Sequence, residues 1–214
     1  MNKGITPDWR SMSPEEIERR SFELISAELG ETKLSGAELA VLKRVIHTTA
    51  DFEYQDTLYF SPGAVKAGME ALKRGAHIVT DTKMAEAGVN KASLSGLGGM
   101  THCFMADEDV KLAAKWEGIT RAAISMEKAC GISEPLIVAV GNAPTALLRL
   151  RELILEQKIR PALIIGVPVG FVNVVESKLL IKALDIPCIL SLGRKGGSTV
   201  AAAICNALLY QTEK

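Results

Sequence analysis

Short apolar runs that alternate with helical patterns are the feature that most constrains the fold of this chain. Five such runs occur, at residues 77–80, 101–104, 136–140, 162–165 and 188–191. Most of them are separated by helical patterns, at 108–129, 144–158, 170–184 and 197–210. Strands that alternate with helices form βαβ units, whose right-handed crossovers produce a parallel sheet. The sequence therefore predicts an α/β fold with a mainly parallel, five-stranded sheet.

The N-terminal third of the chain predicts helices. Residues 13–16 offer a serine N-cap, a proline in the first turn and a capping-box glutamate, and Gly30 can end that helix. A second helix is expected to start within 35–38 and to end near His47, and a third to run over 61–75. Because no repeat, linker or composition break interrupts residues 1–214, we expect one domain with a helical N-terminal extension.

Composition and charge restrict the kinds of partner that this chain can bind. Hydrophobic residues make up 48% of the chain but aromatics only 5%, so the core is expected to be aliphatic, as a sheet covered on both faces requires. The 25 basic and 25 acidic residues balance, which provides no overall field for nucleic acid or an anionic membrane. An anionic ligand must therefore meet a local cluster of positive groups.

The four cysteines favour reduced thiols over disulfides or a metal site, because no Cys-x-x-Cys pair occurs. Cys103 follows His102 directly, but adjacent residues in a strand point to opposite faces. The first residues lack the apolar run of a signal peptide, and glycine and proline interrupt the most apolar stretch, 161–175. We therefore expect a cytoplasmic protein without a bound metal.

Three glycine-containing segments follow predicted strands, at 141–145, 166–170 and 193–198. In an open parallel sheet, ligands bind outside the carboxyl ends of the strands, where backbone N–H groups face solvent. Three such segments predict an anion-accepting rim, although glycine there can also serve turn geometry alone. Neither a dinucleotide fingerprint nor a P-loop motif is present. Arg194-Lys195 adds two positive charges, which fit either a ligand site or a solvated turn.

His47 is the strongest candidate for a catalytic side chain. It is expected in the last turn of the second helix, where the helix dipole stabilises a protonated ring. Arg44 lies three residues earlier, on the same helix face. A histidine in such a setting suits general acid–base work near neutral pH. Spacing alone nevertheless favours a simple capping role, and His77 and His102 are more typical of structural residues in strands.

Nearly the whole chain resembles the precorrin-8 methylmutases, in motifs that keep their order and spacing. The motifs are Arg20-Ser21-Phe22-Glu23, Arg44-Val45-Ile46-His47, Phe60-Ser61-Pro62, Asp81-Thr82-x-Met84, Gly141-Asn142-Ala143-Pro144-Thr145-Ala146-Leu147, Gly166-Val167-Pro168-Val169-Gly170-Phe171-Val172, Glu176-Ser177-Lys178 and Gly193-Arg194-Lys195-Gly196-Gly197-Ser198. The resemblance implies a three-layer α/β/α, flavodoxin-like fold and a homodimer that binds a corrinoid. It also implies migration of a methyl group from C11 to C12 of ring C during cobalamin biosynthesis, which gives hydrogenobyrinate or its cobalt form.

The resemblance assigns roles to particular residues. It implies that His47 is the proton donor and acceptor, and that Ser21, Arg44 and Arg121 contact the substrate. Further substrate contacts are expected along the rim and just after the first predicted strand, at Thr82, Gly141, Asn142, Lys195 and Gly196. A methyl shift of this kind needs neither a redox partner nor a covalent nucleophile, so no cofactor is expected. The substrate's acetate and propionate groups would meet the arginine and lysine side chains.

Two other functions stay open at this point. A corrinoid carrier would bind the ring without converting it, and its binding would not depend on the His47 imidazole. A phosphosugar isomerase or another α/β enzyme would rest on fold analogy alone, and its site would prefer phosphate. Between the two ring substrates of a methylmutase, we slightly favour the cobalt-containing one.

Overall fold

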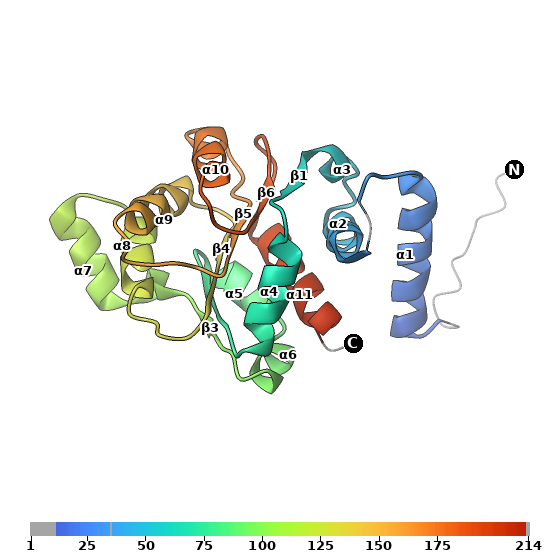
Figure 1. Ribbon diagram of the computed structural model, residues 1–214, viewed down its shortest axis with the longest axis horizontal. Coiled ribbons are helices and arrows are strands. Elements are labelled where there is room, and N and C mark those ends of the chain that lie inside the picture. Colours follow the sequence, from blue (N-terminus) through green and yellow to red (C-terminus); the bar gives the residue numbers. More distant parts are fainter. Residues whose placement is uncertain (1–11, 35, 213–214) are drawn as a thin grey trace, which may run out of the picture.

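A six-stranded sheet forms the centre of the computed structural model, which describes residues 12–34 and 36–212. The strands are β1 (Leu58–Phe60), β2 (His77–Thr80), β3 (Thr101–His102), β4 (Leu136–Val140), β5 (Leu163–Gly166) and β6 (Cys188–Ser191). They lie in the order β1-β6-β5-β4-β2-β3, and every neighbouring pair is parallel except β1 with β6 (Figure 1). The prediction of an α/β fold with a mainly parallel sheet is confirmed.

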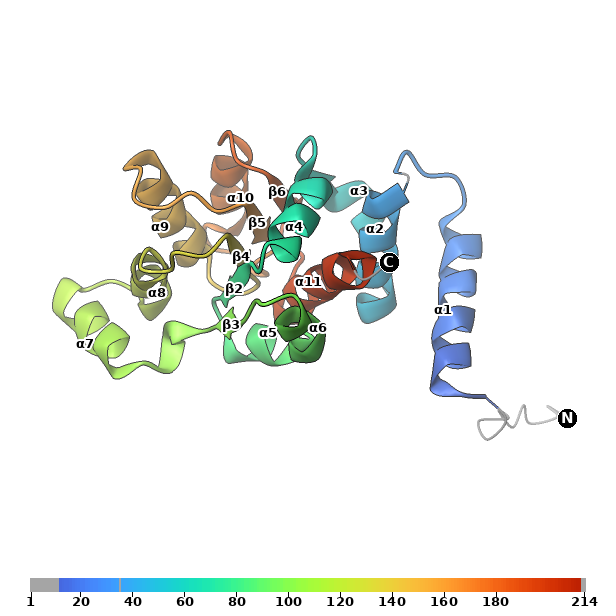
Figure 2. The same cartoon turned by 60° about the horizontal axis from the view of Figure 1, so that its bottom comes forward.

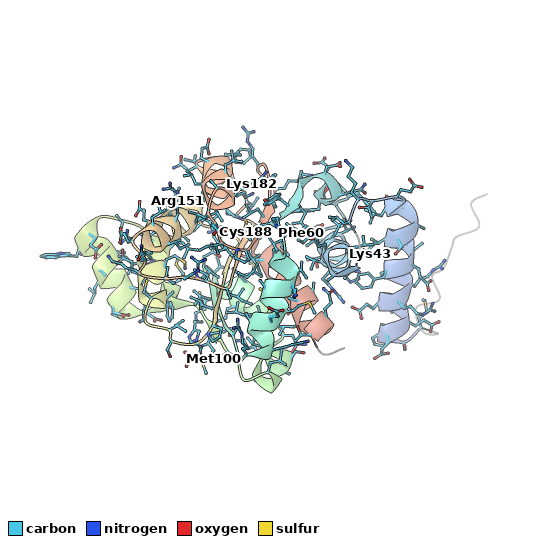
Figure 3. The ribbon with its side chains drawn as sticks, in the orientation of Figure 1. Lys43, Phe60, Met100, Arg151, Lys182 and Cys188 are labelled. Atoms are coloured by element: carbon cyan, nitrogen blue, oxygen red, sulfur yellow. The ribbon has the colours of Figure 1, made fainter. Side chains whose placement is uncertain are left out.

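The sheet has one strand more than the sequence predicted, the antiparallel edge strand β1. Its central residue, Tyr59, lies opposite Leu190 of β6. Three residues followed at once by Ser61-Pro62 are too few to show an alternating pattern in the sequence. Lys182, at the end of the helix that follows β5, covers this edge with its Nζ 4.3 Å from the centre of the Tyr59 ring. Figure 3 shows Lys182 close to the part of the sheet that carries Phe60 and Cys188.

The order of the parallel strands places a switch point between β2 and β4. Numbered among themselves, the five parallel strands run 2-1-3-4-5 across the sheet, starting from β3. The chain therefore leaves β2 toward one edge of the sheet and returns through β4 toward the other. Loops diverge at such a point, which makes the carboxyl ends of β2 and β4 the expected place for a ligand.

Helices cover both faces of the sheet, and alternate residues of β4 show how. Leu136, Val138 and Val140 pack against α8 (Arg121–Ala129), α9 (Pro144–Leu155) and α10 (Val174–Lys182). Ile137 and Ala139 face the other core, which contains α4 (Ala64–Lys73), α5 (Lys83–Gly88), α6 (Lys91–Gly96) and α11 (Ser198–Thr212). All five side chains are buried, so the strand is apolar on both faces, as a covered parallel strand must be.

The two N-terminal helices extend the second of these layers outward. α1 (Pro14–Leu29) starts as predicted, with the Ser13 hydroxyl accepting a hydrogen bond from the Glu16 N–H at 3.2 Å. α2 (Gly36–Thr49) packs against α11, and its expected first residue, Ser35, lies outside the described residues. Both ribbon views place α2 between α11 and α1 (Figures 1 and 2). α1 buries little side-chain surface of its own, with Leu29 its one buried residue.

Some predicted element bounds are wrong for identifiable reasons. The run 101–104 contributes two residues to β3, because a 3-10 helix already begins at Phe104. The pattern 108–129 is two helices, α7 (Glu108–Glu117) and α8, separated where Gly118 takes a left-handed conformation with φ 69°. The third N-terminal helix starts at Ala64 instead of 61, after a turn that ends at Gly63. Three short helices, α3 (Tyr54–Thr57), α5 and α6, were not predicted.

Two classes of feature are not found within 12–34 and 36–212. No helix there combines the length and the apolar character that a bilayer crossing requires. No group of three histidine, cysteine, aspartate or glutamate side chains there is arranged to hold a metal ion.

Candidate active site

Most of the predicted site residues lie at the carboxyl edge of the sheet. Thr82 follows β2, Gly141 and Asn142 follow β4, and Lys195 and Gly196 follow β6. The loops after β2, β4, β5 and β6 are packed against one another at this edge. The contacts that join them show what each residue does in the fold.

Asp81, directly after β2, is hydrogen-bonded to the loop after β4 at the switch point of the sheet. Its side chain is fully buried, and its two carboxylate oxygens accept hydrogen bonds from three consecutive N–H groups. Gly141 donates to Oδ1 at 2.8 Å, and Asn142 and Ala143 donate to Oδ2 at 2.8 and 2.6 Å. Burial raises the pKa of Asp81, and the three N–H donors act in the opposite direction. The Asp81 carboxylate therefore already accepts the hydrogen bonds that the first three N–H groups of the loop after β4 can donate.

This contact corrects the sequence expectation for the loop after β4. The backbone N–H groups of Gly141 and Asn142 were expected to accept an anion of the ligand, but Asp81 already uses them. Gly141 is also needed for packing, because a Cβ atom there would lie 2.6 Å from the Cα atom of Ser198. The Thr82 hydroxyl meets the Ser198 hydroxyl at 2.8 Å. These residues join the loops after β2, β4 and β6 into one rigid edge.

The loops after β5 and β6 are joined just as closely. Gly197 donates its N–H to the carbonyl oxygen of Val167 at 2.8 Å. A Cβ atom on Gly196 would overlap that same carbonyl oxygen, and φ at Gly196 is 155°. Only glycine fits both the space and the backbone conformation at this position.

His47 lies exposed near the end of α2, where an aromatic ring orients it. The imidazole stacks on Phe22 of α1, with ring centroids 5.1 Å apart and planes 17° from parallel. The Arg44 guanidinium lies 4.7 Å from the centre of the same Phe22 ring, and its Nη1 donates to Glu18 at 2.6 Å. The expectation that Arg44 and His47 share a helix face is therefore confirmed.

Two cavities open on the His47 side chain. One, of about 270 Å³, lies between α2, α5 and α11, where Arg44, Thr199 and Tyr210 contribute to its walls. The other, of about 450 Å³, lies between α1 and α2 and is lined by Pro14, Glu15, Ile17, Glu18 and His47. Both cavities reach His47, so a ligand has access to the side chain beside its contact with Phe22, as a group that exchanges protons with a ligand requires.

Lys195 connects the loop after β6 to the end of α2. Its Nζ donates to Asp51 Oδ2 at 2.6 Å and lies 2.7 Å from Glu53 Oε2. The hydrogen bond to Asp51 raises the pKa of Lys195 and lowers the pKa of Asp51. Lys195 thus ties the loop after β6 to the segment that directly follows α2. The positive charge expected to be free for a ligand is compensated by two carboxylates.

Ser21 and Arg121 lie on opposite sides of this region. Ser21 precedes Phe22 on α1, and its hydroxyl donates to the Ile17 carbonyl at 2.8 Å. Arg121 is the first residue of α8, and its Nη1 donates to the Met105 carbonyl at 3.2 Å. Its neighbour Thr120 donates to Thr145 at 2.8 Å, which links the start of α8 to the start of α9.

Lys178 is a second buried charge at this edge, and it belongs to a sequence motif but was not predicted to have a role in the site. It lies in α10 between the buried residues Val174 and Ile181, and none of its surface is exposed. Burial lowers its pKa to about 8. A lysine at helical spacing within an apolar stripe is the sequence signal for such a residue. For Asp81 the signal is weaker, a carboxylate directly after an apolar strand.

Fold and site together define an α/β protein with a mainly parallel sheet, in which an exposed histidine of the N-terminal helices, His47, is stacked on the Phe22 ring. Comparison with known proteins identifies the family. The precorrin-8X methylmutase family model matches residues 16–211. The chain belongs to the precorrin-8X methylmutase family.

Individual relatives are similar over nearly their whole length. The cobalt-precorrin-8 methylmutase of Leptospira interrogans is 45% identical over 206 residues, which cover 92% of this chain and 94% of the relative. That of Salmonella typhimurium is 44% identical over 203 residues, with 92% and 95% covered. A precorrin-8x methyl mutase structure from Thermus thermophilus is 41% identical, with a TM-score of 0.84 over 92% of this chain and 97% of that one.

Proposed function

We propose that this chain moves a methyl group from C11 to C12 of ring C in precorrin-8X or cobalt-precorrin-8, as a step of cobalamin biosynthesis. The product is hydrogenobyrinate or its cobalt form, cobyrinate. The family match over residues 16–211 carries this proposal. The cobalt-containing substrate is favoured, because the two curated relatives reported above are both named cobalt-precorrin-8 methylmutases.

The proposed chemistry needs one group that gives a proton and takes it back. Protonated His47 delivers a proton to a ring nitrogen, which makes the conjugated system electron-poor at C12. The methyl group then migrates on one face, so the bond to C11 breaks as the bond to C12 forms. Because substrate and product are isomers, the proton returns to His47. Stacking on Phe22 supports this role, since it fixes the plane of the imidazole.

The acidic side chains of the corrinoid are proposed to meet Arg44, Arg121 and Lys195. Arg44 and Lys195 already pair with carboxylates, so a substrate carboxylate has to replace or share those partners. Arg121 donates to a carbonyl oxygen instead, and no carboxylate of residues 12–34 and 36–212 forms an ion pair with it. We therefore expect Arg121 to contribute most to electrostatic attraction of the substrate.

The proposed position of the ring follows from the flavodoxin-like order of the five parallel strands. That order supports a ligand at the carboxyl ends of β2 and β4, where Thr82, Gly141 and Asn142 lie. Ser21 of α1 and His47 of α2 would then contact the ring from the side of these two helices. Gly196 would contribute through the loop after β6.

We also propose that the enzyme is a homodimer. The cavities beside His47, of about 270 and 450 Å³, are small for a corrinoid with its acidic side chains, which supports a cleft completed by a second subunit. Three apolar side chains of the loop after β5 are also solvent-exposed, Val169 at 48%, Phe171 at 81% and Val172 at 77%. A cytoplasmic location is proposed because the four cysteines are free thiols.

A visible-absorption time course tests the reaction. Purified protein is mixed with precorrin-8X or cobalt-precorrin-8, and the wild type is compared with His47→Ala and His47→Asn. We expect the wild type to convert the spectrum to that of the rearranged ring, and both variants to bind without converting. His77→Gln is the matched control. This histidine is the first residue of β2 and so lies at the amino ends of the parallel strands, and the variant should convert the ring at the wild-type rate.

Each outcome has a distinct meaning. If both His47 variants convert at the wild-type rate, another group donates the proton. If the wild type binds the ring and leaves it unchanged, the protein is a corrinoid carrier. The relatives reported above are named as methylmutases, which favours the enzyme.

A further inference from the structure

Lys178 has an unusual environment for a buried lysine. Its Nζ donates to Ser191 Oγ at 3.2 Å, to the Gly193 carbonyl at 2.9 Å and to the Lys195 carbonyl at 2.9 Å. Three ammonium hydrogens thus match three neutral oxygen acceptors. Among residues 12–34 and 36–212, no carboxylate pairs with this ammonium.

Stability alone does not explain an ammonium at this position. Removing a charge from water without an opposite charge is costly, and apolar residues of similar volume often replace buried charges without loss of stability. Val174 and Ile181, one helical turn to either side, are buried apolar residues. A methionine would continue that stripe at similar length. The contacts of the ammonium therefore point to a role in the loop that it holds.

That loop follows β6 and begins the path to α11. The Gly193 carbonyl and the Lys195 carbonyl both point inward, toward Nζ. In a trans peptide the C=O and the following N–H point in opposite directions, and no cis peptide occurs in the described residues. The N–H groups of Arg194 and Gly196 consequently face away from the core.

These two N–H groups are available for a ligand. Neither has a backbone or side-chain acceptor within the described part of the chain. The loop is also tied on both sides, because the Arg194 carbonyl accepts from Gly170 and Gly197 donates to Val167. Two outward N–H groups next to the Lys195 side chain resemble the backbone arrangement that binds anionic groups in other proteins.

We propose that Lys178 is a positioning residue for substrate binding: its buried ammonium holds the Gly193 and Lys195 carbonyls inward, and thereby presents the Arg194 and Gly196 N–H groups to a carboxylate of the corrinoid. The proposal rests on the proposed function for the substrate and goes beyond it in assigning a role to α10. Lys178 itself touches no substrate, since its side chain is fully buried.

The test compares wild type with Lys178→Met in two measurements. Steady-state conversion should show KM for the corrinoid raised about tenfold, with kcat within about threefold, because the loop binds substrate while His47 acts from α2. Amide hydrogen exchange in 193–197 should be faster in the variant, without added ligand. Ser191→Ala, which removes one of the three acceptors, should give a smaller change in the same direction and serves if Lys178→Met does not fold.

The two measurements separate this proposal from the proposed function. Unchanged exchange in the loop overturns the positioning role, whatever the activity. Faster exchange with an unchanged KM also overturns it, because the loop then does not meet the substrate. A fall in kcat at constant KM would contradict it as well. If the wild type fails to convert the ring, the proposed function fails, and loop exchange still decides whether Lys178 orders 193–197.

Discussion

Two buried charges of opposite sign organise the carboxyl edge of the sheet, where the substrate is proposed to bind. Asp81 accepts hydrogen bonds from three backbone N–H groups of the loop after β4. Lys178 donates hydrogen bonds to a hydroxyl of β6 and to two backbone carbonyls of the loop after it. Within residues 12–34 and 36–212, each charge is stabilised by backbone dipoles, and at Lys178 also by the Ser191 hydroxyl, without a counter-ion. Such contacts are directional, so they hold the loops in one arrangement.

Replacement of Asp81 by asparagine tests the first of these charges. Asp81→Asn presents an NH2 group to N–H donors that need an acceptor, so at least one donor is left unpaired. We expect a loss of about 2 kcal/mol in the free energy of unfolding. Urea denaturation measures it, with Asp56→Asn on an exposed carboxylate as control. Equal midpoints for Asp81→Asn and wild type would contradict the role given to this carboxylate.

The pH dependence of stability tests the second charge. Burial lowers the pKa of Lys178 in the folded state to about 8 from 10.5, so below pH 8 the folded protein carries the full cost of a buried ammonium. Between pH 8 and 10.5 the unfolded chain binds more protons, and folding stability rises with pH. Relative to Lys178→Met, wild type should gain about 2–3 kcal/mol between pH 7 and 10. A difference that stays constant over this range would contradict the assignment.

At the scale of elements, the loops after the strands act as a unit because glycine lets them approach closely. Gly141 packs on the start of α11, and Gly196 packs on the loop after β5. Lys195 then ties the loop after β6 to the segment that directly follows α2. Residues that the chain separates widely are thereby held at one edge. A change in one loop is expected to disturb the others.

Gly196→Ala tests this coupling between loops. The new Cβ would overlap the Val167 carbonyl oxygen at a backbone conformation that favours glycine, so we expect a loss of at least about 2 kcal/mol of unfolding free energy. Gly193→Ala is the matched control: its φ is 81°, but no atom lies within 4 Å of the added Cβ. Chemical denaturation of both variants should show the smaller loss at Gly193. Equal losses would mean that strain alone, and not the contact with Val167, decides the cost.

The elements themselves could be predicted well where the pattern was long. The helix at 14–29 and the strand at 136–140 follow from capping and apolar periodicity, and both are confirmed. β1 could not be predicted, because its three residues are a strand only through pairing with β6. Its position depends on a contact across about half the chain. The local sequence does not indicate which distant strand a segment pairs with.

The site shows the same division between local and distant information. The shared face of Arg44 and His47 follows from a spacing of three residues on a helix. The contact of Asp81 with Gly141 and that of Lys195 with Asp51 join residues 60 and 144 positions apart. Charge patterns therefore indicated positive groups but not the carboxylates that pair with them. The prediction that the backbone N–H groups after β4 are free to bind a ligand was wrong, because the distant Asp81 carboxylate accepts hydrogen bonds from them.

At the scale of the whole molecule, α1 and α2 form a helical extension at one end of the fold (Figure 1). α1 touches the rest of the described chain mainly through α2, and it carries exposed apolar side chains at Ile17 and Leu24. α7 lies at the other end of the molecule (Figure 1), and its Trp116 is 91% exposed. Apolar surface of this kind favours association of protein chains.

The proposed dimer is tested by mass in solution. Each chain has a mass of 23.0 kDa, and analytical ultracentrifugation should find a species of twice that mass at micromolar concentration. Phe171→Glu, which adds a charge to the exposed loop after β5, should shift the equilibrium toward the single chain by at least about tenfold. A wild-type protein that sediments only as a single chain would contradict the shared cleft.

The central claim is that His47 exchanges a proton with the ring while a methyl group moves within it. The most direct test uses substrate carrying a ¹³C-labelled methyl group at C11, followed by NMR with wild type and His47→Asn. The account predicts that the labelled resonance moves from its position on C11 to that on C12 in the wild type alone, while the variant still binds the ring. Migration at the wild-type rate in His47→Asn, or a label that never leaves C11 in the wild type, would contradict it.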